Sequence, residues 1–225
     1  MRKFTFIFLG LLPFSTFAQK LHSRVEIPDS AYVKIDTTLK AKGYSKDLLI
    51  FLIATEIIDP NMQEAFKNHE TPDWTLLEQA VESHYGHGVS LESTMDGEIR
   101  WYGFKKEWPL YCRQIVRRVN EFGPFALVSD RAIQFNTCAW EIFLHSRDNS
   151  ELRTALRWSD SAVTMNPLPE HLDTYANLLY KLGRVQQAIA YEERALRTVA
   201  GKNEDMEKGI ITTLGKMHDR KPTWP

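Results

Sequence analysis

The stretch from residue 137 to residue 200 most constrains the fold, because it carries one pattern twice. The aligned positions are Thr137-Cys-Ala139-Trp with Thr174-Tyr-Ala176-Asn, then Ala155 and Ala162 with Ala188 and Ala195. Within each copy the last two alanines stand two helical turns apart, so they share one helix face. A small residue at that place lets two helices approach closely. Each copy therefore predicts a helix, a turn and a second helix.

The copies are offset by roughly 33–37 residues, the period expected of tetratricopeptide repeats. Pro167 follows the first copy, where such a repeat turns to begin the next. The stretch therefore resembles a pair of tetratricopeptide repeats, at 131–167 and 168–200. The resemblance implies an all-α, TPR-like stack of helical hairpins, an α-α superhelix.

The remaining patterns extend this reading along the chain. We predict a helical-repeat domain over 71–220, with an amphipathic capping helix at 203–218 and a loose tail at 221–225. Residues 19–70 form a lead-in with buried helices. There Ser45 offers a helix cap, and the apolar run at 48–58 favours a helix over the rival buried strand. Asp59-Pro60 predicts the end of that helix and the start of another.

Residues 89–104 leave two readings open. Asp96-Gly97 between two alternating runs is a hairpin signal. Leu91, Met95, Ile99 and Tyr102 fit the helical period equally well. Because the rest of the chain is helical, we predict a helix here.

The N-terminus has the pattern of a signal peptide. Arg2 and Lys3 precede a short apolar run, and small residues stand before Gln19, which predicts cleavage near Ala18 and a signal peptide at 1–18. No later segment is apolar for long enough to span a bilayer, so we predict no membrane insertion. The mature protein is expected in the periplasm or outside the cell.

Charge and motifs limit the function. The net charge is -1, without the basic excess of a nucleic-acid-binding protein. The sequence has no Cys-x-x-Cys, phosphate loop or serine elbow, and we predict a non-enzyme without cofactor or metal. The nearest metal-like group, Glu82, His84 and His87, is interpreted as a polar helix end, with a small hydrolase as a remote hypothesis.

A binding surface is the better candidate. In helical-repeat stacks the first helix of each pair lines a concave face that holds partners. We expect outward-facing residues there on both repeats, and the predicted binding residues are Asn136, Trp140, Asp173, Asn177, Tyr180 and Lys181. The sequence thus predicts a scaffold for a protein or peptide partner, and leaves the oligomeric state open.

A closer resemblance comes from two runs. Leu172-Asp-Thr-Tyr-Ala-Asn-Leu-Leu-Tyr-Lys-Leu-Gly183 and Thr137-Cys-Ala-Trp140 are similar to the helical C-terminal region of secreted thioredoxin-like proteins of Bacteroidetes type. Their Cys-x-x-Cys domain is missing here. The resemblance implies the architecture and the compartment. It also leaves an alternative function: the helical half of a redox system that uses Cys112 or Cys138, which could also pair as a disulfide.

Overall fold

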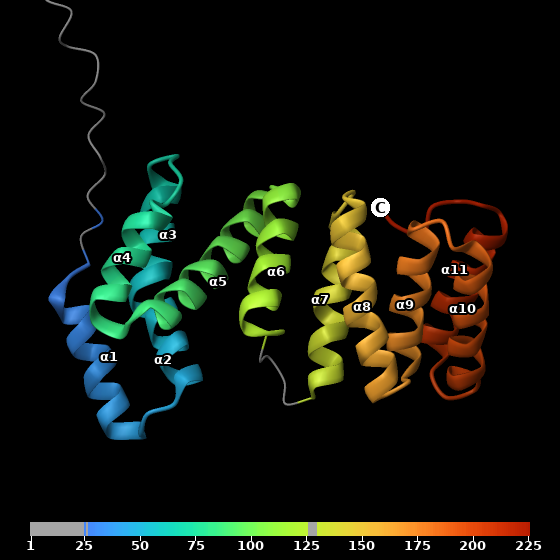
Figure 1. Ribbon diagram of the computed structural model, residues 1–225, viewed down its shortest axis with the longest axis horizontal. Coiled ribbons are helices and arrows are strands. Elements are labelled where there is room, and N and C mark those ends of the chain that lie inside the picture. Colours follow the sequence, from blue (N-terminus) through green and yellow to red (C-terminus); the bar gives the residue numbers. More distant parts are fainter. Residues whose placement is uncertain (1–24, 26, 126–129) are drawn as a thin grey trace, which may run out of the picture.

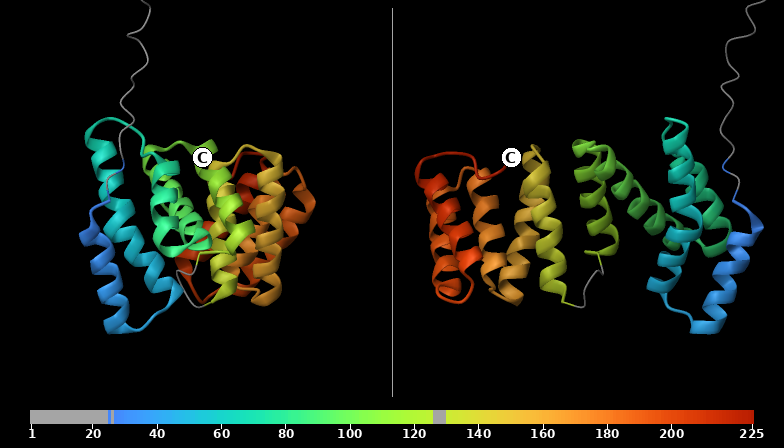
Figure 2. Two further views of the ribbon diagram at one scale, coloured as in Figure 1. Left: turned by 60° about the vertical axis from the view of Figure 1, so that its left-hand side comes forward. Right: turned by 180° about the vertical axis from the view of Figure 1, so that it is seen from behind.

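Helices arranged in a row make up the described part of the chain. The computed structural model describes residues 25, 27–125 and 130–225, so the predicted signal peptide lies outside the described residues. The helices are α1 (Asp29–Lys42), α2 (Lys46–Ile53), the π-helical turn η1 (Ala54–Ile58), α3 (Asp59–Lys67), α4 (Trp74–Tyr85), α5 (His87–Lys105), α6 (Trp108–Phe122), α7 (Arg131–His145), α8 (Asn149–Met165), α9 (Pro169–Lys181), α10 (Val185–Val199) and α11 (Glu204–His218). In Figure 1, α1 to α4 form a group at one end of the long axis, α5 to α9 follow one another along it, and α10 and α11 lie at the other end; the reverse view of Figure 2 shows the same arrangement. The predicted all-α stack is confirmed.

The two sequence repeats form the helical hairpins α7–α8 and α9–α10, each with extensive internal packing. The aligned alanines are all fully buried, as the close helix approach requires: Ala139, Ala155, Ala162, Ala176, Ala188 and Ala195. Helix α11 packs on α10 and buries Ile210, Leu214 and Met217, as expected of a cap. The architecture is a stack of helical hairpins compatible with a TPR-like fold.

The N-terminal helices build a core of their own. Ile35 of α1, Leu49 of α2, Ile58 of η1 and Leu77 of α4 belong to one buried cluster. The helix predicted at 48–58 is therefore confirmed over the rival strand. Its cap is confirmed as well, because Ser45 accepts a hydrogen bond from the backbone N–H of Leu48 at 3.1 Å.

The helix start predicted at Asp59-Pro60 agrees with α3, which has the proline in its first turn, but the predicted break and the aspartate cap are wrong. Asp59 has helical angles, φ -62° and ψ -42°, and α2, η1 and α3 follow one another without a gap. A proline inside a helix lacks its N–H and clashes with the carbonyl four residues before it. Here the chain widens into a π turn, in which Asp59 N–H donates to the Ala54 carbonyl, and the helix continues past the proline.

Residues 89–104 lie within α5, so the helical reading is right and the hairpin is excluded. The structure also explains the glycine that suggested a turn. A Cβ at Gly97 would lie 2.7 Å from Ile58 Cγ2 and 3.0 Å from Trp74 Cζ3. The absence of a side chain at Gly97 therefore allows α5 to pack closely against the N-terminal core.

We expect Gly97→Ala to lower the free energy of unfolding by about 1–2 kcal/mol, because the new methyl group displaces packed side chains. Gly209→Ala is the matched control: it is helical and has no atom within 4 Å of the added Cβ. That control should gain roughly 0.5–1 kcal/mol from helix propensity. Urea unfolding of both variants measures the difference, and equal stabilisation by the two alanines would contradict this packing.

Candidate functional site

The predicted binding face lies on α7 and α9, but part of it points into the protein. Asn177 and Tyr180 are buried, with exposed fractions of 2% and 8%. Their predicted outward orientation is wrong. Asp173 and Lys181 are half-buried, and binding by these residues remains a prediction.

On α7, Asn136 and Trp140 are also half-buried. The ring of Trp140 packs on Phe143, with 4.9 Å between centroids. The carboxamide oxygen of Asn136 is buried without a hydrogen-bond partner among the described residues. Asn136 and Trp140 therefore lie in surroundings more like the protein core than like an open binding surface.

Asn177 is buried because it hydrogen-bonds to Asp173, one of two carboxyl groups that face each other between α9 and α10. Its Nδ2 donates to the backbone carbonyl of Asp173 at 2.9 Å and to Asp173 Oδ1 at 3.0 Å. The Asp173 side chain lies close to that of Glu192, which is 0% exposed and whose carboxyl oxygens have no hydrogen-bond partner among the described residues. Two neighbouring buried carboxyl groups can hydrogen-bond to each other only when one of them carries a proton. Burial raises the pKa of both groups, and the nearby Asp173 raises the pKa of Glu192 further.

Sequence reasoning missed Glu192, which stands in the charged run Glu192-Glu193-Arg194. A signal was present, however. Glu192 lies four residues after Ala188 and three before Ala195, on the face that the alanines bury. A glutamate on a buried helix face predicts a shifted pKa.

The pair makes stability depend on pH. Glu192 keeps its proton in the folded chain at pH values where the unfolded chain has released it, above about 4.3. The free energy of unfolding therefore falls as the pH rises from that value towards the raised folded-state pKa of Glu192. We expect Glu192→Gln to remove this slope, with a Tm higher than wild type by roughly 2–5 °C at pH 8 and little changed at pH 4.

Glu193→Gln is the control, because Glu193 is exposed one residue away on the same helix. It should follow the wild-type profile of Tm against pH. A parallel shift of the Glu192→Gln profile at every pH would show that Glu192 does not hold a proton in the folded state.

The other end of the predicted face opens onto a groove of about 680 Å³, here called the tail groove. It is lined by Trp108, Pro109, Arg113, Leu144, His145, Ser146, Arg147, Asp148, Glu151, Lys181, Trp224 and Pro225. Its wall is aromatic on one side, where the rings of Trp108 and His145 stack at 3.8 Å. Three basic side chains, Arg113, Arg147 and Lys181, line it against two acidic ones, Asp148 and Glu151, which leaves an excess of positive charge. The groove can thus hold an apolar group and a negative charge together.

Lys181 ties α9 to the C-terminal end of α7. Its Nζ donates to the Phe143 carbonyl at 2.5 Å, among the last carbonyls of a helix, where a cation is favoured. The ammonium also lies 5.1 Å from the centre of the Trp224 ring. Burial lowers the pKa of Lys181 to about 8, and Arg147 acts in the same direction.

The C-terminal tail forms part of the lining of this groove. After α11 the chain runs back across α10 and α9, and its end lies beside α8 and α9 (Figures 1 and 2). Trp224 contacts Tyr180, with 6.2 Å between centroids, and Phe143, with 6.5 Å. The tail at 221–225 was predicted to be loose, and this prediction is wrong. A tryptophan has enough apolar area to hold an extended segment in place.

The two cysteines are buried free thiols. Burial raises the pKa of Cys112 to about 12 and that of Cys138 to about 11, and neighbouring carboxylates add to the shift at Cys112. The thiolate is the species that exchanges disulfides. At neutral pH both side chains are therefore protonated and chemically inert.

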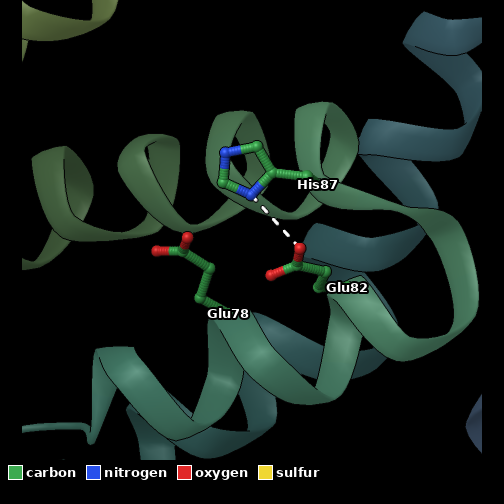
Figure 3. A group of neighbouring side chains, drawn as sticks. All are labelled: Glu78, Glu82 and His87. Atoms are coloured by element: carbon green, nitrogen blue, oxygen red, sulfur yellow. Dashed lines mark ion pairs between the residues drawn. The ribbon is translucent and has the colours of Figure 1, made fainter.

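One cluster of potential metal ligands stands apart, at the turn from α4 to α5. Ligand atoms of Glu78, Glu82 and His87 lie within 4.8 Å of one another (Figure 3). Glu82 Oε1 and His87 Nδ1 are 3.4 Å apart, and both side chains are exposed. His84, which the sequence suggested, instead stacks on Tyr32 at 3.7 Å. Only Glu82 and His87 of the trio are in direct contact, and a structural zinc site would need a fourth donor.

Comparison with protein-family models, with curated proteins and with solved structures gives no match. Among the described residues no helix is both long enough and apolar enough to cross a membrane. The function is therefore inferred from the geometry of this chain alone.

Proposed function

We propose that the protein is a non-catalytic scaffold that binds an extended peptide segment of a partner protein in the tail groove. One observation carries the proposal: the tail of this same chain packs beside the groove, where Trp224 contacts Phe143, Tyr180 and Lys181 and forms part of the groove wall. A surface that accommodates its own tail has the width and chemistry for a similar segment from elsewhere. Grooves in helical-repeat stacks are used in this way.

The groove also indicates what the partner segment offers. Trp224 shows that an aromatic side chain fits between Tyr180, Phe143 and Lys181. Two exposed arginines, Arg113 and Arg147, line the groove beside the tail. Guanidinium groups favour carboxylates. The partner segment is therefore extended, carries an aromatic residue, and places a carboxylate beside these arginines.

The N-terminal pattern supports export of the scaffold, and the likeness of its repeats to secreted thioredoxin-like proteins agrees with that compartment. The second hypothesis, a helical half of a redox system, finds no support in the site. Both thiols are buried, and their pKa values lie far above neutral pH. We therefore keep the peptide-binding function alone.

The test uses a synthetic peptide of residues 221–225 with a free carboxyl end, measured by titration calorimetry. A chain that ends at Arg220 should bind this peptide, because its groove is open. The full-length chain should bind at least about tenfold more weakly, because its tethered tail competes. Binding of equal strength to both chains, or to neither, would count against the proposal.

Two variants of the shortened chain locate the site. Arg113→Glu combined with Arg147→Glu should weaken peptide binding about tenfold by replacing attraction with repulsion. Arg194→Glu is the control, since Arg194 is exposed on α10 outside the groove. If the control weakens binding as much as the double variant does, the peptide is held by net charge and not by the groove.

A further inference from the structure

A second hollow lies where the N-terminal helices meet the repeats, and the proposed peptide binding does not use it. We call it the junction cleft. It has a volume of about 590 Å³ and lies among α2, η1, α5, α6 and α7. Its lining is Asp47, Ile50, Phe51, Ala54, Glu92, Ser93, Asp96, Ile99, Arg100, Tyr111, Ile115, Arg118, Phe125, Thr137, Cys138 and Glu141. Such a size, with apolar walls and a few polar groups, is typical of a small-molecule site.

The polar floor of the cleft is organised by Arg118, which is 5% exposed. Its Nη2 donates to Glu92 Oε1 at 2.7 Å, and its Nε donates to Asp96 Oδ1 at 3.0 Å. Its Nη1 donates to the Gly123 carbonyl at 2.6 Å. Lys46 pairs with the other oxygen of Glu92, at 2.6 Å. All three guanidinium nitrogens of Arg118 thus donate to groups of the protein, so its charge is not available to a ligand.

Negative charge remains after these pairs are formed. The cleft is lined by four carboxylates, on Asp47, Glu92, Asp96 and Glu141, against two guanidinium groups. One of the two, Arg100, pairs outside the cleft with Asp59. An excess of carboxylate therefore faces the cleft.

Glu141 is the carboxylate best placed for a ligand. Tyr111 donates a hydrogen bond to its Oε2 at 2.8 Å, which orients the group. Its histidine neighbour, His145, is 3.7 Å away. Burial lowers the pKa of His145, so that ring is neutral at pH 7 and leaves the charge of Glu141 uncompensated.

A second, independent observation points to a ligand. Ser93 lines the cleft with only 1% of its surface exposed, and its Oγ has no hydrogen-bond partner among the described residues. A buried hydroxyl without a partner is unfavourable, and such groups in native proteins call for an explanation. A ligand with an N–H group would supply the missing partner.

The apolar walls complete the chemistry. Tyr111, Phe125 and Phe51 line the cleft; Phe51 is 60% exposed, and the Phe125 ring already has the Arg118 guanidinium 4.8 Å from its centre. Aromatic faces attract cations as well as apolar groups. Carboxylate, aromatic ring and unpartnered hydroxyl together match a cation on an apolar body.

We propose that the junction cleft binds an organic cation, an ammonium or guanidinium group carried on an apolar chain or ring. The cation pairs with Glu141 and hydrogen-bonds to Ser93 Oγ, and its apolar body lies against Phe125 and Ile115. The same chemistry is found in a free amine and in a lysine side chain of a peptide. The experiment separates these two sources.

The probes are 2-phenylethylammonium for the free amine, Nα-acetyl-lysine methylamide for the side chain, and neutral 2-phenylethanol as control. The full chain is titrated at pH 7 and followed by NMR, whose backbone shifts locate the site. At least one cation should bind saturably near Ser93 and Glu141, about tenfold more tightly than the alcohol. The cation that binds more tightly identifies the source.

Glu141→Gln keeps the Tyr111 hydrogen bond and removes the charge, so we expect binding to weaken about fivefold to tenfold. Ser93→Ala should weaken it about threefold. Glu121→Gln is the control, since Glu121 is exposed on α6 and does not line the cleft. The proposal is overturned if neither cation saturates, if the alcohol binds equally well, or if Glu141→Gln behaves like the control.

Discussion

Close packing of helices at residues with almost no side chain determines the rest of this structure. The six aligned alanines of the two hairpins are 0% exposed, and Gly97 lies so near Ile58 that even a methyl group would clash. Packing this close leaves little freedom for one helix to slide along another. It therefore fixes which polar side chains come to face each other. Glu192 meets Asp173, and Lys181 reaches the end of α7, as consequences of that register.

Buried polar groups lie at the interfaces between helices. Arg118 of α6 holds two carboxylates of α5, and the carboxyl pair joins α9 to α10. Buried ion pairs contribute little net stability, because desolvation offsets their attraction. Removing one partner is costly, however, since it leaves the other buried and unpaired. Such groups penalise wrong arrangements more than they stabilise the correct one, which matters in a stack whose apolar faces are much alike.

The sequence was sufficient for the helices and their packing face, since both depend on local patterns. The alanine spacing, the Ser45 cap and the helix through 89–104 are examples. It was insufficient where one local signal competes with a distant contact. Asp59-Pro60 has the form of a helix start, yet the chain continues through a π turn. Trp224 stands in a short polar tail, and no local pattern states that a groove lies within its reach.

The predicted binding site shows the same limit in more detail. Helical register alone cannot tell the concave surface from the interface with the neighbouring helix, because both lie on the inner side of α9. Asn177 and Tyr180 fall on the interface, while Lys181, one residue on, reaches the groove. Arg113 and Arg147 come from other segments, and only the fold brings them there. The junction cleft was hidden for the same reason, since its lining comes from five helical segments.

The tail also determines which partners can use the groove. A segment tethered this closely has an effective concentration on the order of 1 mM at its own site. If the tail alone bound with a Kd of about 10 μM, a free peptide of equal affinity would bind about a hundredfold more weakly to the full-length chain. A partner must therefore gain contacts that the tail does not make. The partner's carboxylate can gain such contacts, because a negative charge beside Lys181 stabilises an ammonium whose pKa burial has lowered to about 8. The tail thus selects against weak aromatic peptides and in favour of segments that bring both an aromatic ring and a well-placed negative charge.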